Sequence, residues 1–260
     1  MRLKSSSRIA RRPTSMRNIW TLLRRDFIMA IETLRFQALL ITETILMVVI
    51  NSMMMGDYGY GANNEWFFLF PYYFIPIIIV VISSGLVSRD RETGMLDLLR
   101  LSGMTKNEFM VSKLLFTMSM YFILVIPYII NVAFYAIKFG DYYLIVSSLG
   151  IFGLYLLMYV FFSLGILIIS AISTREAYSS GIGTVYLVYV VLVQPFVLRG
   201  APVFGSPGSS FMGRIQTDIH RIYIGGYPNL AVWGPLLIGS LGLIVAYYYV
   251  ISRLWRGLKE

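Results

Sequence analysis

The chain has 260 residues, of which 57% are hydrophobic and 13% are charged. Soluble domains carry about 25% charged residues, so this composition excludes a water-soluble globule. The 22 Lys and Arg exceed the 13 Asp and Glu and give a net charge of +9 at pH 7. Such an excess is compatible with binding to nucleic acid, with binding to anionic lipid, or with the cytosolic ends of membrane helices, and the positions of the charges decide between these.

The charged residues are separated by uncharged runs that are long enough to cross a membrane. A hydrocarbon core about 30 Å thick needs about 20 helical residues. Five runs of at least 22 residues contain no charged residue, and a sixth run, residues 36–55, is interrupted only by Glu43. Continuous apolar runs of this length are typical of membrane helices and not of the alternating strands of a β-barrel. We therefore expect an all-α membrane protein with six transmembrane helices, at about residues 36–55, 66–88, 114–137, 143–172, 177–198 and 231–252.

Lys and Arg are distributed unevenly between the two sides of this bundle. One side, which includes both ends of the chain, holds 18 of the 22, and the opposite connections hold Lys138, Arg199, Arg214 and Arg221. Because basic loops resist translocation, the positive side is the cytosolic one. We therefore expect a multi-pass protein of the plasma (inner) membrane with cytosolic termini. The basic balance then follows from the cytosolic connections of the spans and needs no nucleic acid, and membrane lipids are expected partners.

Two segments precede the first span. Residues 1–16 are basic and Ser-rich and lack an apolar core, which predicts a disordered tail and not a signal peptide. Residues 17–35 are amphipathic at helical spacing, with Leu23 and Phe27 on the apolar face and Arg25 on the polar face. This pattern predicts an interfacial helix on the cytosolic surface. It is either an elbow that moves the first span or a basic membrane anchor, and the segment alone does not decide between them.

Residues 89–105, between the second and third spans, carry the clearest pattern outside the membrane. Apolar residues cover most of a two-turn helix that starts near Met95, and Gly94 and Gly103 bracket it as expected breaks. A helix this short does not fold alone in water. It needs a cover, which is either the lipid interface or a groove on a cytosolic partner. A capping box of Thr105 and Glu108 then restarts the helix toward the third span.

The same stretch resembles a known family. The resemblance rests on an acid and a glycine, a leucine-rich stretch, a Met-Thr-Lys step, a second acid and a closing lysine, at Glu92, Gly94, Leu96, Leu98, Leu99, Met104, Thr105, Lys106, Glu108 and Lys113. This pattern resembles the cytosolic segment of ATP-binding-cassette type-2 permeases. The interfacial helix, the six spans and a Tyr-Pro-Asn step at residues 227–229 are similar too. Gly103 departs from the proline that is common in the family at this position, and Ser112 from a residue that is often glycine.

The resemblance implies that residues 17–260 form one permease domain, an exporter subunit with a coupling helix that docks in a cleft of a cytosolic ATPase. The residues that it assigns to docking are Arg91, Glu92, Gly94, Met95, Leu98, Leu99 and Gly103. It also implies a second permease chain, identical or related, that completes the substrate pathway. The chain has no Gly-x-x-x-x-Gly-Lys-Ser/Thr loop, so ATP and Mg²⁺ are expected on the partner, with no cofactor or enzymatic activity on this chain.

Polar residues inside the spans are the candidates for substrate contact. Glu43 is the single charged residue within a span, and such residues usually face a partner or a water-filled cavity. It either marks a substrate or proton path or, as a shallow residue, reaches the headgroups or pairs with Arg35. The other candidates are polar residues of the third and fourth spans, Tyr121, Tyr128, Asn131, Tyr155 and Tyr159. Hydrogen bonding between helices explains the same residues.

Residues 199–230 form the outer connection before the last span. Apolar residues at helical spacing from Phe211 to Ile222 predict a short surface helix. Asp218 and His220 on this helix are expected to be solvated and not to bind a metal.

Two functions of other classes stay open. A secondary transporter needs coupling-ion ligands or an inverted repeat with broken helices. A non-transporting membrane scaffold needs only the basic anchor and the small-residue helix faces. A neighbouring gene for a phosphate-loop ATPase would favour the permease over both.

Overall fold

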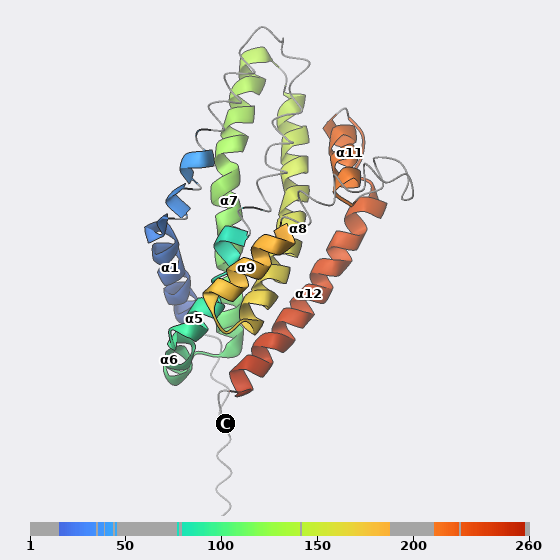
Figure 1. Cartoon of the computed structure of the whole chain (residues 1–260). Helices are drawn as coiled ribbons and strands as arrows, with labels where there is room; N and C mark the ends of the chain where they lie inside the picture. The colour runs from blue at the N-terminus through green and yellow to red at the C-terminus, as the bar shows by residue number, and fades with distance from the viewer. Residues whose placement is uncertain are drawn as a thin grey trace, which may run out of the picture.

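The computed structural model describes residues 16–34, 36–38, 40–43, 45, 77, 80–140, 142–187, 211–223 and 225–257. Within these residues 88% are helical and there is no strand, which confirms the all-α class. The helices are α1 (Met16–Glu32), α5 (Ser88–Glu92), α6 (Met95–Leu101), α7 (Lys106–Phe139), α8 (Tyr143–Ile172), α9 (Glu176–Leu187), α11 (Phe211–Tyr223) and α12 (Leu230–Gly257). Figure 1 shows the long helices α7, α8 and α12 as the frame, with α1, α5, α6 and α9 toward its lower half and α11 beside the upper end of α12.

Three described helices are long and apolar enough to cross a membrane. They are Lys106–Lys138 in α7, Tyr143–Ile172 in α8 and Leu230–Arg256 in α12, and they correspond to the third, fourth and sixth predicted spans. The other predicted spans extend beyond the described residues. The helix of the third span begins ahead of the predicted residue 114, because it starts at the Thr105 cap and continues unbroken.

α8 forms the centre of the bundle. Its sequence is apolar on all sides, as in helices that are buried on all sides. Tyr155 and Met158 are fully buried in α8, and α7, α9, α11 and α12 all pack against it. The outward faces of α7 and α12 are apolar and exposed, as at Ile130 and Ile238, which suits contact with lipid.

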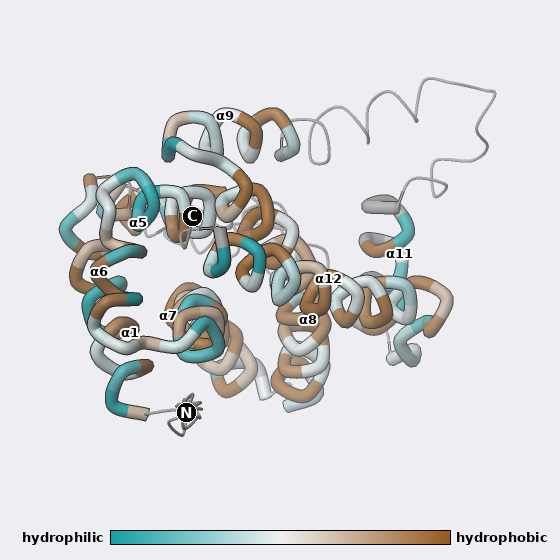
Figure 2. The backbone as a smooth tube through the Cα atoms, turned by 90° about the horizontal axis from the view of Figure 1, so that it is seen from below, coloured by the Kyte–Doolittle hydropathy of each residue, from teal (hydrophilic) through white to brown (hydrophobic). Residues whose placement is uncertain are grey.

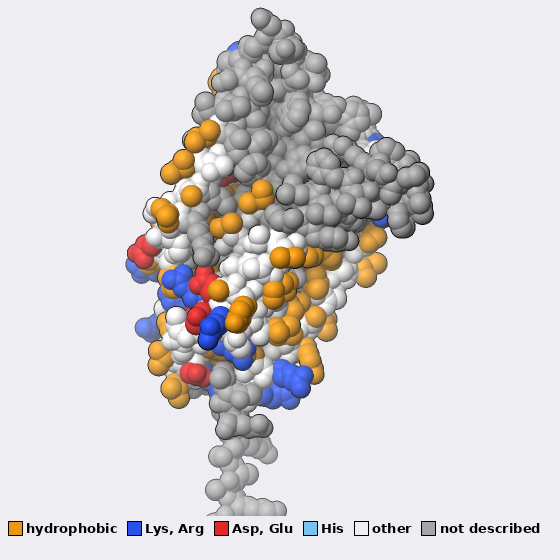
Figure 3. All heavy atoms as spheres, viewed as in Figure 1, with side chains coloured by type: hydrophobic (Ala, Val, Ile, Leu, Met, Phe, Trp, Pro, Cys, Tyr) orange, Lys and Arg blue, Asp and Glu red, His pale blue; other side chains and the backbone are white. Residues whose placement is uncertain are grey.

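Most of the described hydrophilic residues gather at one end of the molecule. Seen from below, they lie on α1, α5 and α6, and a separate hydrophilic stretch lies on α11, whereas α8 and α12 are mostly hydrophobic (Figure 2). On the face shown in Figure 3, most acidic and basic side chains lie at the lower end and the described surface above them is largely apolar. The polar end is therefore where α1, α5 and α6 meet the long helices.

The connection from α5 to α7 has the predicted breaks. Gly94 and Gly103 have φ angles of 69° and 85°, in the left-handed region that favours glycine. Proline holds φ near −65°, so the family's common proline does not fit the backbone at Gly103. The predicted capping box is confirmed: the Thr105 hydroxyl accepts from the Glu108 N–H, and a Glu108 carboxylate oxygen accepts from the Thr105 N–H at 2.7 Å.

The outer helix α11 lies where the sequence predicted it, but one of its residues differs from the prediction. Asp218 is buried, so the expectation that it is solvated is wrong. Its Oδ2 atom accepts from Trp233 Nε1 at 2.6 Å and from the Asn229 N–H at 3.0 Å. Asp218 therefore joins α11 to the start of α12. The structure does not describe the side chain of His220.

Candidate functional site

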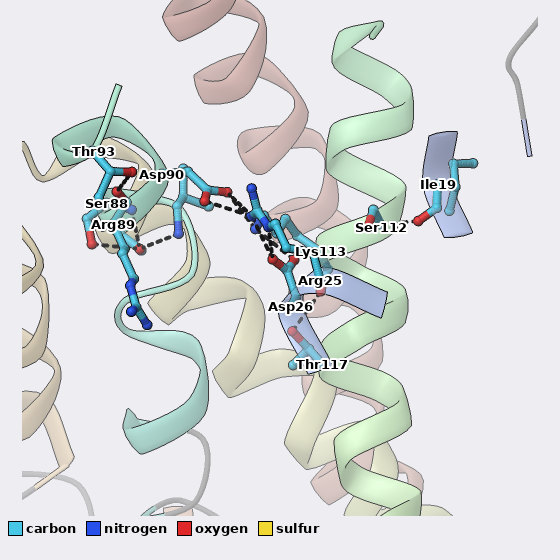
Figure 4. A network of polar contacts seen from close by, with 12 residues as sticks. Ile19, Arg25, Asp26, Ser88, Arg89, Asp90, Thr93, Ser112, Lys113 and Thr117 are labelled. Carbon is cyan, nitrogen blue, oxygen red and sulfur yellow. Dashed lines mark hydrogen bonds and ion pairs between the residues drawn. The ribbon is translucent and has the colours of Figure 1, made fainter. Parts of the chain in front are cut away.

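Four charged side chains from three separate segments meet in the interior at the polar end of the bundle (Figure 4). Arg25 and Asp26 come from α1, Asp90 from α5, and Lys113 from the first part of α7. Lys113 is fully buried, and Asp26 and Asp90 are only 4% and 3% exposed. Charged residues are almost never buried this deeply unless they are paired. We call these four residues the charge quartet.

Each cation of the charge quartet contacts both carboxylates. Arg25 Nη2 lies 2.6 Å from Asp26 Oδ1 and 2.7 Å from Asp90 Oδ1. Lys113 Nζ lies 2.8 Å from Asp26 Oδ2 and 2.7 Å from Asp90 Oδ2. Two positive and two negative charges cancel, so the quartet is neutral as a group.

The electrostatics keep Arg25 charged. Burial disfavours the charge on its guanidinium, but the carboxylates of Asp90 and Asp26 outweigh this effect and raise the pKa of Arg25 above its ordinary value. Removing one member of a buried ionic network leaves an uncompensated charge, which costs about 3–5 kcal/mol. The charge quartet therefore favours the one arrangement of α1, α5 and α7 in which all four groups are satisfied.

The charge quartet was not predicted from the sequence, because the helical pattern places Arg25 on the polar face of an interfacial helix. Leu22 and Leu23 of α1 are buried, and Asp26 is buried one turn further along the same face. An acid at helical spacing from buried leucines was the available signal. In the sequence, Lys113 stands out only as part of the family pattern.

Two further contacts hold α1 against the start of α7. The Asn18 side-chain amide donates to the Glu108 carboxylate at 3.4 Å, and the Ser112 hydroxyl donates to the Ile19 carbonyl at 3.4 Å. On another side, Lys106 Nζ donates to Ser252 Oγ in α12 at 2.9 Å. The beginning of α7 is thus connected to both α1 and α12.

α5 is connected to α8 and α9 as well as to the charge quartet. Arg91 Nη1 donates to the Ile172 carbonyl at the end of α8 at 3.3 Å. Glu92 Oε2 accepts from the Glu176 N–H at the start of α9 at 2.9 Å. Both residues were predicted to dock on the ATPase, and both make hydrogen bonds within the chain. Ser170 Oγ in α8 also accepts hydrogen bonds from two backbone N–H groups. One belongs to the first residue of α5 and the other to the residue before it.

α6 is anchored on one side and exposed on the other. Leu96 is buried in a cluster that includes Met104, Phe109 and Tyr247. Leu98 and Leu101 are 60% and 83% exposed. Of the remaining residues predicted to dock, Met95 and Leu99 are partly buried. Leu101 is more exposed than Leu98, although it was not among the residues predicted to dock.

Glu43 faces the interior of the bundle. It is 4% exposed, and its Oε1 atom has no hydrogen-bond partner within the described part of the chain. Tyr128 of α7 lies within electrostatic range of this carboxylate, and its hydroxyl is likewise buried, with no hydrogen-bond partner among the residues that the structure describes. This burial favours an inward role over contact with headgroups. Arg35, the proposed ion-pair partner, lies outside the described residues.

The structure brings some of the other pathway candidates together. The Tyr121 hydroxyl donates to the Phe152 carbonyl in α8, and its ring lies 5.0 Å from that of Tyr159. This hydrogen bond joins α7 to α8. It agrees with the alternative explanation of these residues, which is hydrogen bonding between helices. Tyr155 is fully buried nearby on α8, and Asn131 is partly buried on α7. In the described part of the chain, no three acidic or His side chains gather as metal ligands would.

The fold and this site define a helical membrane protein that presents a short apolar helix at its polar end. The sequence matches the family described as ABC-2 family transporter protein over residues 24–217, and the chain belongs to that family. It is therefore a permease subunit of an ATP-binding-cassette transporter, a membrane protein of a family whose members are in general non-catalytic and work with a cytosolic ATPase. The match covers the charge quartet, α5 and α6. No match was found among curated proteins.

Proposed function

We propose that this chain is the transmembrane subunit of an exporter in the plasma membrane. It crosses the membrane six times with both termini in the cytosol, and it forms the substrate pathway with a second permease chain. A separate ATPase, which carries ATP and Mg²⁺, docks on α5 and α6. Family membership supports the permease role, because ABC-2 permeases generally work with a cytosolic ATPase.

The observation that carries the docking proposal is the exposed side of α6. Leu98 and Leu101 are exposed on a seven-residue helix at the polar end, while Leu96 holds the opposite side in the interior. Exposed apolar surface rimmed by polar residues is typical of an interaction site. Asp97 and Arg100 flank the two leucines and supply such a rim. The ATPase cleft would therefore receive a short apolar ridge with charges at its edges.

α5 connects this ridge to the membrane helices. Asp90 joins it to α1 and α7 through the charge quartet, and Arg91 and Glu92 join it to α8 and α9. A displacement of α6 by the ATPase would therefore move α1, α7 and the junction of α8 and α9 together. Closure of the ATPase dimer on ATP supplies that displacement.

In this mechanism the substrate pathway lies at the interface between the two permease chains. Glu43 and Tyr128 are the candidates for contact with the substrate, supported by their burial and by polar atoms that have no hydrogen-bond partner among the described residues. Polar atoms buried in a membrane bundle without protein partners are suited to meet water or a passing ligand. The contacts of Tyr121 instead support a role in holding α7 against α8.

The docking proposal is tested with Leu98→Asp and Leu98→Asp/Leu101→Asp in the full chain, co-expressed with its ATPase. Placing a charge on the ridge should abolish co-purification of the ATPase, because the carboxylate would be buried without a partner. The matched control is Leu230→Asp at the opposite end of the bundle, where the leucine is 82% exposed, and it should retain the complex. An intact complex that hydrolyses ATP with the double variant would refute docking on α6.

A further inference from the structure

Glu43 is a buried acid without a counter-charge in the described part of the chain. Its side chain is only 4% exposed, and none of the ion pairs among the described residues includes it. Acids are almost never buried this deeply unless they are paired. Asp26 and Asp90 follow this rule, because each contacts both Arg25 and Lys113. Glu43 therefore needs a positive partner of another kind.

A second buried polar group lies near this acid. Tyr128 of α7 is 3% exposed, lies within electrostatic range of Glu43, and has a hydroxyl with no hydrogen-bond partner among the described residues. A phenol hydroxyl both donates and accepts hydrogen bonds. The Tyr128 hydroxyl is therefore able to accept a hydrogen bond from a protonated Glu43 and to donate one to an ionised Glu43.

The helices next to Tyr128 bring no counter-charge to this pair. On α7, Lys138 and Lys113 lie about 15 Å and about 22 Å from Tyr128 along the helix axis. Lys113 is also paired already with the two acids of the charge quartet. α8, which packs against α7, contains no charged residue. Among the described side chains, Tyr128 is therefore the titratable group that faces Glu43.

The pair lies deep in the part of the bundle that is expected to cross the membrane. Tyr128 is about 21 Å from the cytosolic end and about 14 Å from the outer end of the predicted span 114–137. It belongs to the hydrophobic cluster that also includes Phe36, Leu124 and Val132. An unpaired carboxylate is costly in such a place. Among cations, a proton neutralises a carboxylate without needing a cavity of its own, so it suits a closely packed site.

We propose that Glu43 is a proton-binding site that holds its proton in the resting chain and releases it when the bundle opens to water during transport. In the closed bundle the proton stays, because the ionised acid would have no counter-charge. On opening, water solvates the carboxylate, the proton leaves to that water, and the Tyr128 hydroxyl donates to the ion. The resting proton needs neither the ATPase nor a second permease chain. Its release rests on the proposed function and adds a proton step to the transport cycle.

Infrared spectroscopy of the full chain, purified in detergent without any ATPase, tests the resting proton. A protonated carboxylic acid has a C=O stretching band that a carboxylate lacks. At about pH 6 an exposed Glu, whose ordinary pKa is about 4.3, is ionised, so the remaining band reports buried acids. We expect Glu43→Gln to remove intensity from this band, and the matched control Glu32→Gln, at an exposed position of α1, to leave it unchanged. A wild-type spectrum without the band, or one that Glu43→Gln does not change, would overturn the proposal.

The position of the same band tests the role of Tyr128. Tyr128→Phe removes only the hydroxyl and should shift the Glu43 band to higher wavenumber, because the C=O bond of a carboxylic acid that loses a hydrogen bond vibrates faster. Tyr142→Phe, at an exposed position near the start of α8, is the matched control and should leave the band in place. An unshifted band in Tyr128→Phe would overturn the hydrogen bond to Glu43.

The release step is measured on the complete transporter. A non-hydrolysable ATP analogue closes the ATPase dimer without producing protons by hydrolysis, and it should weaken the Glu43 band and release protons to a pH indicator dye. Leu98→Asp/Leu101→Asp, which is designed to prevent docking, should keep the band when the analogue is added. A band that persists in the docked, nucleotide-bound wild type would overturn the release step. Because the resting proton is measured without an ATPase, its failure leaves docking on α6 untouched, and a failure of docking leaves the resting proton standing.

Discussion

Replacing Lys113 by Met removes one of the two cations of the charge quartet without changing the length of the side chain much. Lys113 is fully buried and contacts Asp26 at 2.8 Å and Asp90 at 2.7 Å. The variant leaves two buried carboxylates with Arg25 as their single cation. Breaking a buried ionic network in this way costs about 3–5 kcal/mol. Since whole proteins are stable by about 5–15 kcal/mol, we expect a large fraction of the stability to be lost.

Reversible unfolding of the purified chain in mixed SDS micelles measures this loss. The matched variant Lys113→Met/Asp90→Asn removes one charge of each sign and leaves the Arg25–Asp26 pair, which are 2.6 Å apart. It should recover at least about half of the lost free energy, because no buried carboxylate is then in excess. Equal destabilisation of the single and double variants would refute the reasoning, since the cost would then come from packing and not from charge.

The remaining predictions concern the α6–α7 junction, the outer helix and the membrane interior. Gly103→Pro should destabilise the chain by at least about 1 kcal/mol and lower the yield of the ATPase complex, because proline does not adopt a φ of 85°; normal unfolding and yield would contradict this. Trp233→Phe should cost about 1.5–3 kcal/mol by removing a donor from buried Asp218, measured by the same unfolding assay; a loss below about 0.5 kcal/mol would count against it. Glu43→Gln should leave expression unchanged and lower transport in proteoliposomes, and unchanged transport would exclude a pathway role.

Local features of the fold were predictable because they depend on residues close together in the sequence. The capping box needs only Thr105 and Glu108, three residues apart, and each has the partner that the pattern predicted. Gly94 and Gly103 mark the ends of α6 because both need a positive φ angle. The three long helices follow from uncharged runs that exceed the thickness of a membrane.

Tertiary partners were not predictable from the same signals. The ion pairs and hydrogen bonds of the charge quartet join residues 65 and 87 positions apart, and helical periodicity alone does not say which distant segment a buried charge meets. The helical pattern therefore predicts only that Arg25 lies on the polar face of an interfacial helix. Asp218 was misassigned for the same reason, because its partner Trp233 lies on the next helix. The exposure of Leu101 depends on how α6 rests on the bundle.

The most direct test of the central claim is to identify what covers α6 in the assembled transporter. Because the chain contains no Cys, Leu101→Cys supplies a unique thiol on the exposed side of α6, which can carry a maleimide–benzophenone crosslinker. The control is Leu230→Cys, labelled in the same way. Residue 230 begins α12 at the end of the bundle opposite to α6. After illumination and mass spectrometry, we expect crosslinks from position 101 to the ATPase and none from position 230. Crosslinks from position 101 to lipid alone, in a complex that hydrolyses ATP, would contradict the account.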